Sequence, residues 1–178
     1  MARNIILTLF FFIAVNAFAQ NPEFSGRPYL WQNKVALSDL ERADAQSDNK
    51  IKGLGYGGIQ TLYTVFTPKS YVRFNKSELP KLVIKVEPGV DPSEQYIIIK
   101  AIVKKDKRTF MVGSYSMTGR TKNTEDQQIK PEYRKLKDGV YEITLPENIE
   151  AGDYGFFSVS IDATQIGNRL KISCFGID

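Results

Sequence analysis

The sequence predicts an all-β protein, a single immunoglobulin-like antiparallel β-sandwich of about seven to eight strands. Past residue 60, apolar and polar residues alternate with a period of two, in short runs rich in β-branched and aromatic side chains. Pro, Gly and Asp separate these runs as turn residues do. No run with helical periodicity lies between them, which argues against a parallel α/β sheet.

The expected strands follow one another along the chain. They cover residues 61–66, 70–74, 81–86, 95–103, 109–117, 141–145, 154–161 and 170–175. Residues 118–131 are polar and are expected to form a loop. The sequence does not decide the secondary structure of segment 35–48. Ser38 and Glu41 resemble a helix capping box, but the same residues also suit an edge strand. We slightly favour the strand, because no second helix is expected to pack against this segment.

The chain is expected to begin with a signal peptide over residues 1–19, followed by one domain over residues 20–178. An apolar run over residues 5–15 precedes Ala17-Phe18-Ala19, which places small residues where a signal peptidase reads them. Spanning a bilayer takes roughly 20 apolar residues, so this run is short for an anchor. We expect export to the periplasm or the cell surface, with no transmembrane segment after cleavage.

The composition excludes several kinds of chemistry. The chain has no histidine and one cysteine, Cys174. Histidine-assisted nucleophiles, imidazole zinc sites and an internal disulfide are therefore excluded. Cys174 alternates with Leu170 and Ile172, so we expect a buried thiol. The net charge of +4 is too mild to indicate nucleic-acid binding. No cofactor and no metal site is expected.

Two groups of residues are candidates for binding a partner. Tyr29 and Trp31 form an aromatic cluster that suits a sugar ring or a protein anchor, or else a first strand held in the core. The second group is a basic run made of Lys104, Lys105, Lys107 and Arg108. It suits an anionic partner, such as a surface polysaccharide, lipopolysaccharide or an acidic protein. Alternatively, it is a solvated hairpin tip whose charges protect a sheet edge.

Other motifs favour structural roles. The segment 53–58 matches G-x-G-x-x-G, but a strand-like run follows it, which indicates a glycine-rich loop. Glu125-Asp126 lacks the spacing of a calcium loop. Gly152-Asp153-Tyr154 has the features of a tyrosine corner. We expect Tyr154 to be buried, with its hydroxyl bonded to the preceding connector. Tyr154 and Phe156 then share one side of their strand, and Phe157 takes the other.

The C-terminal part of the chain resembles a known family. The residues that carry this resemblance are Leu145-Pro146, Ala151-Gly152-Asp153-Tyr154-Gly155-Phe156 and the ending Cys174-Phe175-Gly176-Ile177-Asp178. They resemble a family of uncharacterised exported proteins of Gram-negative bacteria, with a Cys-Phe-Gly-(Val/Ile)-Asp ending. Ala151 stands where that family usually has proline. The resemblance implies export and a single β-sandwich domain, and it brings no activity and no functional residue.

The expected function is a non-catalytic binding or interaction module of the bacterial cell envelope, whose partner is an unknown protein or polysaccharide. A carboxylate-dependent hydrolase of envelope material is the main alternative. An envelope-located inhibitor or immunity protein, acting through a loop such as 118–131, is another. Clustered acids in one cleft would favour the enzyme, and an aromatic or basic face would favour the binding module.

Overall fold

The computed structural model describes residues 21–33, 36–51, 59–115, 127–159 and 169–178. It confirms the all-β prediction, because these residues form antiparallel sheets and a single short helix, α1 (Pro92–Gln95). Fourteen strands are formed within the described ranges, so seven to eight was too few. The difference arises because residues 95–103 divide at Ala101, and because five further strands form outside the eight expected ranges. These are β1 (Pro28–Gln32), β2 (Ala36–Asp39), β3 (Glu41–Ile51), β10 (Gln128–Ile129) and β11 (Glu132–Lys137).

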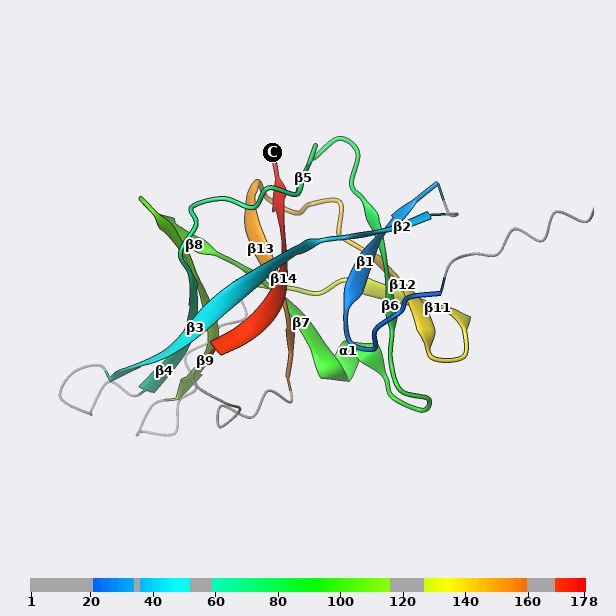
Figure 1. The fold of residues 1–178 in the computed structure, drawn as a ribbon, viewed down its shortest axis with the longest axis horizontal. Helices are drawn as coiled ribbons and strands as arrows, with labels where there is room; N and C mark the ends of the chain where they lie inside the picture. The colour runs from blue at the N-terminus through cyan, green and yellow to red at the C-terminus, as the bar shows by residue number, and fades with distance from the viewer. Residues whose placement is uncertain (1–20, 34–35, 52–58, 116–126, 160–168) are drawn as a thin grey trace, which may run out of the picture.

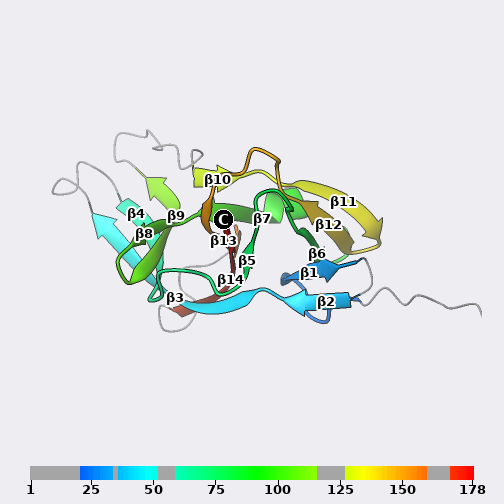
Figure 2. The same cartoon turned by 90° about the horizontal axis from the view of Figure 1, so that it is seen from above.

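The strands form two sheets. The small sheet has the spatial order β11 (Glu132–Lys137), β12 (Val140–Thr144), β6 (Lys81–Lys85), β1 and β2 (Ala36–Asp39). The large sheet has the order β10 (Gln128–Ile129), β7 (Tyr96–Lys100), β13 (Gly152–Ser158), β14 (Arg169–Ile177), β3 (Glu41–Ile51), β4 (Ile59–Val65), β9 (Lys107–Tyr115) and β8 (Ile102–Lys104). The short strand β5 (Arg73–Phe74) adds to β14 in parallel. Figure 1 and Figure 2 show the small sheet at one end of the molecule and the curled large sheet at the other.

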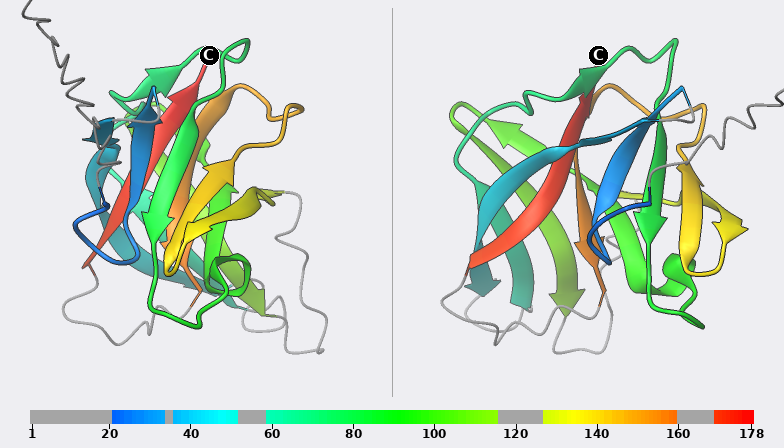
Figure 3. Two further views of the ribbon diagram at one scale, coloured as in Figure 1. Left: turned by 90° about the vertical axis from the view of Figure 1, so that its right-hand side faces the viewer. Right: turned by 45° about the vertical axis from the view of Figure 1, so that its right-hand side comes forward.

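The large sheet curls strongly (Figure 3). Strands β7 and β8 are separated by Ala101 alone, yet β7 pairs with β13 while β8 pairs with β9. The chain therefore links distant parts of the same sheet across the curl.

Two apolar clusters fill the interior. The first includes residues of both sheets: Leu82, Ile84, Ile143, Tyr154, Phe156 and Phe175. The second lies on the other face of the large sheet and includes Ala43, Tyr63, Ile99, Phe110, Phe157 and Cys174. The predicted alternation along residues 154–157 is confirmed, because Tyr154 and Phe156 join the first cluster and Phe157 joins the second. Cys174 is buried as predicted, and its burial raises the pKa of its thiol to about 12.

Segment 35–48 is extended where it is described, so the capping-box alternative is wrong. Strand β2 lies in the small sheet, and β3 lies in the large sheet beside β14. The chain crosses from one sheet to the other at the buried Leu40 (Figure 1). Apolar Leu40 is part of the first cluster, and this packing favours an extended crossing over a helix.

Tyr154 forms the predicted contact with its preceding connector. The Tyr154 side chain is buried, and its hydroxyl donates a hydrogen bond to the Glu150 carbonyl at 2.6 Å. The ring also stacks on Phe175, with ring centroids 5.4 Å apart. Gly152 has a φ of +153°, a backbone conformation that favours glycine at this bend.

Some expectations lie outside the described residues. These are the signal peptide over 1–19, the glycine-rich segment 53–58 and Glu125-Asp126. Of the expected loop over 118–131, the described part includes strand β10. Among the described residues, no helix is long and apolar enough to cross a membrane.

Candidate functional site

The structure separates the residues of the predicted basic run. Lys104 and Lys105 are exposed and Lys107 is half-buried, whereas Arg108 is 0% exposed. The Arg108 guanidinium donates to both carboxylate oxygens of Glu41, at 2.8 and 3.0 Å, and to the carbonyl of Thr67. Arg108 is therefore held in the interior, out of reach of a partner, and only the three lysines remain on the surface.

The predicted aromatic cluster also divides. Tyr29 is 7% exposed, and its ring lies beneath the guanidinium of Arg27 at 5.2 Å. Trp31 is half-buried and lines a cavity of about 570 Å³ between the end of β1 and the segment 73–81. A shared Tyr29 and Trp31 contact surface is therefore not formed, because only Trp31 lies beside open space.

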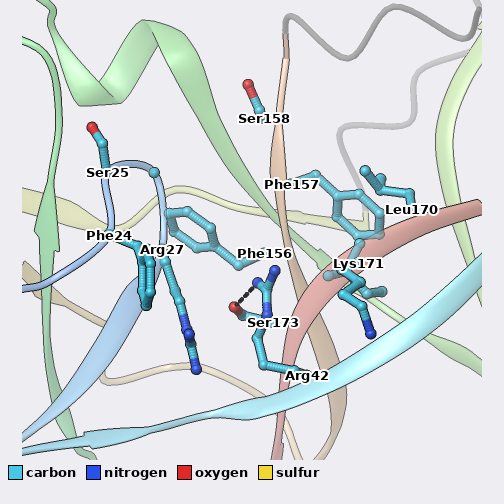
Figure 4. Close-up of a pocket in the computed structure, with 12 residues that line it drawn as sticks. Phe24, Ser25, Arg27, Arg42, Phe156, Phe157, Ser158, Leu170, Lys171 and Ser173 are labelled. Carbon is cyan, nitrogen blue, oxygen red and sulfur yellow. Dashed lines mark hydrogen bonds between the residues drawn. The ribbon is translucent and has the colours of Figure 1, made fainter. Parts of the chain in front are cut away.

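A cationic cavity that the sequence did not indicate lies where the chain before β1 approaches β3, β13 and β14 (Figure 4). We call it the Arg27–Arg42 cavity, and its volume is about 360 Å³. The residues that define its character are Phe24, Arg27, Arg42, Phe156, Lys171 and Ser173. Cationic groups and hydroxyls thus surround an apolar floor.

Arg27 is held in place from several sides. Its guanidinium forms an ion pair with Asp39 at 2.7 Å. The same group lies 5.5 Å from the centre of the Phe24 ring and 5.2 Å from that of Tyr29. These cation–π contacts fix its orientation. The Nε of Arg27 is buried without a hydrogen-bond partner, so this side chain retains donor capacity beside the cavity.

Arg42 is the less neutralised cation of the cavity. Its Nη1 donates to the hydroxyl of Ser173 at 2.9 Å, and no described carboxylate forms an ion pair with it. The pKa of Arg42 is lowered below its ordinary value. Burial is the largest cause, and repulsion from Arg27 is the second. Strand pairing sets this position, since Ser173 in β14 lies directly opposite Arg42 in β3.

The floor of the cavity is rigid and apolar. Phe156 is buried and stacks on Tyr96, with ring centroids 5.2 Å apart. Ile172 and Leu170 also line the cavity. At the rim, Lys171 pairs with Asp44 at 3.0 Å, and both side chains are exposed. The arrangement suits a ligand that combines an anionic group with an apolar face.

The buried carboxylates are each held by cations. Glu142 is paired with both Lys81 and Arg134. Burial by itself raises the pKa of Glu142, but the hydrogen bonds and charges of these two cations outweigh burial, so the pKa is lowered overall. Asp153 accepts from the backbone N–H of Ser70 at 2.6 Å and pairs with Arg73 at 3.3 Å. The lowered pKa keeps Glu142 ionised, the opposite of what a general acid requires. Within the described ranges, no group of three or more acidic or cysteine side chains is placed to hold a metal ion.

Sequence reasoning missed Arg27 and Arg42 because neither belongs to a motif. Arg27 precedes β1 and Arg42 lies in β3, so tertiary packing alone brings them to one cavity, although the alternation around Arg42 does place it on the same side of the chain as Leu40. Comparison of this chain with protein-family models, curated proteins and solved structures found no match. The resemblance to the exported family stays a prediction.

Proposed function

We propose that this protein is an exported, non-catalytic binding module of the bacterial cell envelope. Its ligand is an anionic unit of an envelope polysaccharide, bearing a carboxylate or a phosphate, held in the Arg27–Arg42 cavity. The observation that carries this proposal is a cavity of about 360 Å³ lined by two arginines, of which Arg42 forms no ion pair with a described carboxylate.

An anion bound between the two guanidinium groups would relieve their mutual repulsion. The planar guanidinium donates two parallel hydrogen bonds to a carboxylate or a phosphate, so arginine suits such ligands better than lysine does. The cavity volume of about 360 Å³ is within the range of small-ligand sites. The buried Phe156 floor gives a sugar ring an apolar face to rest on.

The finer classification of the fold is part of the same proposal. Two antiparallel sheets that share an apolar cluster, together with the Tyr154 corner, support an immunoglobulin-like sandwich as a single domain over residues 20–178. Export to the periplasm or the cell surface rests on the expected signal peptide.

Calorimetric titration with small probes tests the cavity. We expect galacturonate or glucose 6-phosphate to bind the purified protein and neutral glucose to bind far more weakly. Arg42→Gln should lower the affinity for the anionic probe about tenfold, because it removes a charged hydrogen-bond donor. Arg169→Gln is the matched control, since Arg169 is an exposed arginine of β14 that does not line the cavity. Equal losses in the two variants, or equal binding of glucose, would contradict the site.

A further inference from the structure

A second hollow lies on the outer face of the large sheet, over β3, β4, β9 and β8. Its volume is about 440 Å³. We call it the lysine hollow, after Lys50, Lys104 and Lys107, which line it. Tyr63 in β4 and Phe110 in β9 belong to the second apolar cluster. Their neighbours Leu62 and Met111 therefore face the opposite side of the sheet. None of the residues of the Arg27–Arg42 cavity lines this hollow.

The floor of the lysine hollow is recessed and combines apolar residues with uncharged polar ones, Gln60, Thr64 and Thr109. Leu62 is 7% exposed and Gln60 is 8% exposed, although both lie on the outer face of the sheet. The amide of Gln60 donates to the sulfur of Met111 at 3.2 Å, and a thioether is a weak acceptor. Ile102 in β8 is 42% exposed and extends this apolar surface to the edge of the sheet.

The rim of the lysine hollow carries unneutralised positive charge. Lys50, Lys104 and Lys107 face one acid, Asp48. None of these four side chains forms an ion pair with another described residue. A basic rim around the apolar side chains of Leu62, Ile102 and Met111 is complementary to an acidic partner that also presents apolar side chains.

We propose that the lysine hollow docks an acidic segment of a partner protein in an extended conformation. A polypeptide supplies carboxylates for the lysines and apolar side chains for Leu62, Ile102 and Met111. An acidic polysaccharide fits less well, because sugar rings stack on aromatic rings and none of the residues that line this hollow is aromatic. Strand β8 is also the last strand of its sheet among the described residues, so its outer edge can pair with an added strand.

Fluorescence anisotropy with a labelled, end-capped octapeptide of alternating Glu and Val tests this site. We expect binding to the purified protein, and little binding when Gln replaces Glu in the peptide. The double variant Lys104→Glu/Lys107→Glu should lower the affinity about tenfold or more, because it places like charges against the peptide. Lys105→Glu is the matched control, since Lys105 lies in the same turn but does not line the hollow. Ile102→Ser should lower the affinity severalfold through the lost apolar contact.

Three other outcomes would contradict the proposed site, and each has a different interpretation. The same loss in Lys105→Glu as in the double variant would indicate diffuse attraction to a basic hairpin. Displacement of the peptide by polygalacturonate, with no effect of Ile102→Ser on either ligand, would indicate an acidic polysaccharide instead. No peptide binding at millimolar concentration would remove the site altogether. Arg42→Gln should leave peptide binding unchanged. Evidence against peptide binding at the lysine hollow is therefore distinguishable from evidence against anion binding in the Arg27–Arg42 cavity.

Discussion

At the scale of single residues, Tyr154 links local backbone geometry to the core. Its hydroxyl closes the connector onto the strand through the Glu150 carbonyl, while its ring stacks on Phe175 between the sheets. Burial is the main cause that raises the pKa of Tyr154 to about 12, so the hydroxyl remains a hydrogen-bond donor throughout the physiological range. Both parts of the side chain therefore contribute to stability.

Two substitutions at Tyr154 separate the contribution of the hydroxyl to stability from that of the ring. Tyr154→Phe should cost about 1 kcal/mol of unfolding free energy, the value of a lost hydrogen bond whose acceptor stays unpaired. Tyr154→Ala should cost about 3–5 kcal/mol, as for other large aromatic side chains removed from a core. Denaturant melts measure both values. If both variants unfold like wild type while ligand binding is lost, Tyr154 is a contact residue and its structural role is wrong.

At the scale of strands, a chain of charges ties the large sheet together. Arg108 in β9 is bonded to Glu41 in β3 and lies 3.5 Å from Asp153 in β13. Asp153 in turn meets Arg73 in β5, and Arg73 pairs with Asp178 at 2.6 Å. The network joins segments that are distant in sequence, and its inner members are buried. Buried charges of this kind are costly when a partner is removed.

Breaking the centre of this network should destabilise the protein strongly. Arg108→Met leaves the buried carboxylate of Glu41 without its cation and should cost about 3–5 kcal/mol. The double variant Arg108→Met/Glu41→Leu should recover much of that loss, because it removes both buried charges. Lys104→Met, an exposed lysine on the neighbouring strand, serves as control and should change stability by less than about 0.5 kcal/mol. Chemical denaturation measures all three, and an Arg108→Met midpoint equal to wild type would contradict the role of the network.

At the scale of the whole molecule, the proposed binding sites lie at two separate places. The Arg27–Arg42 cavity opens between the chain before β1 and the large sheet. The lysine hollow lies on the outer face of the curled sheet. We propose a small anion as the ligand of the first site and a polypeptide segment as the ligand of the second.

The proposed location of these surfaces outside the cytoplasm depends on the N-terminus. We expect the mature chain to begin at Gln20, because the small residues Ala17 and Ala19 follow a short apolar run. Intact-mass measurement of protein recovered from the cell envelope checks the cleavage site. A mass that retains residues 1–19 would contradict cleavage, and recovery from the cytoplasm alone would contradict export.

The sequence by itself determined the all-β class, the burial of Cys174, the corner at Tyr154 and the opposite orientations of Phe156 and Phe157. These features depend on the period of two along a single strand and on local turn residues. Only the tertiary structure decided that Arg108 and Tyr29 are buried and that Arg27 and Arg42 line one cavity. Alternation in the sequence predicts which side of a strand a residue occupies. It does not predict which strand pairs with that strand, or which residues cover that side. The pairing of Ser173 with Arg42 depends on long-range register, which the packing of the two sheets selects.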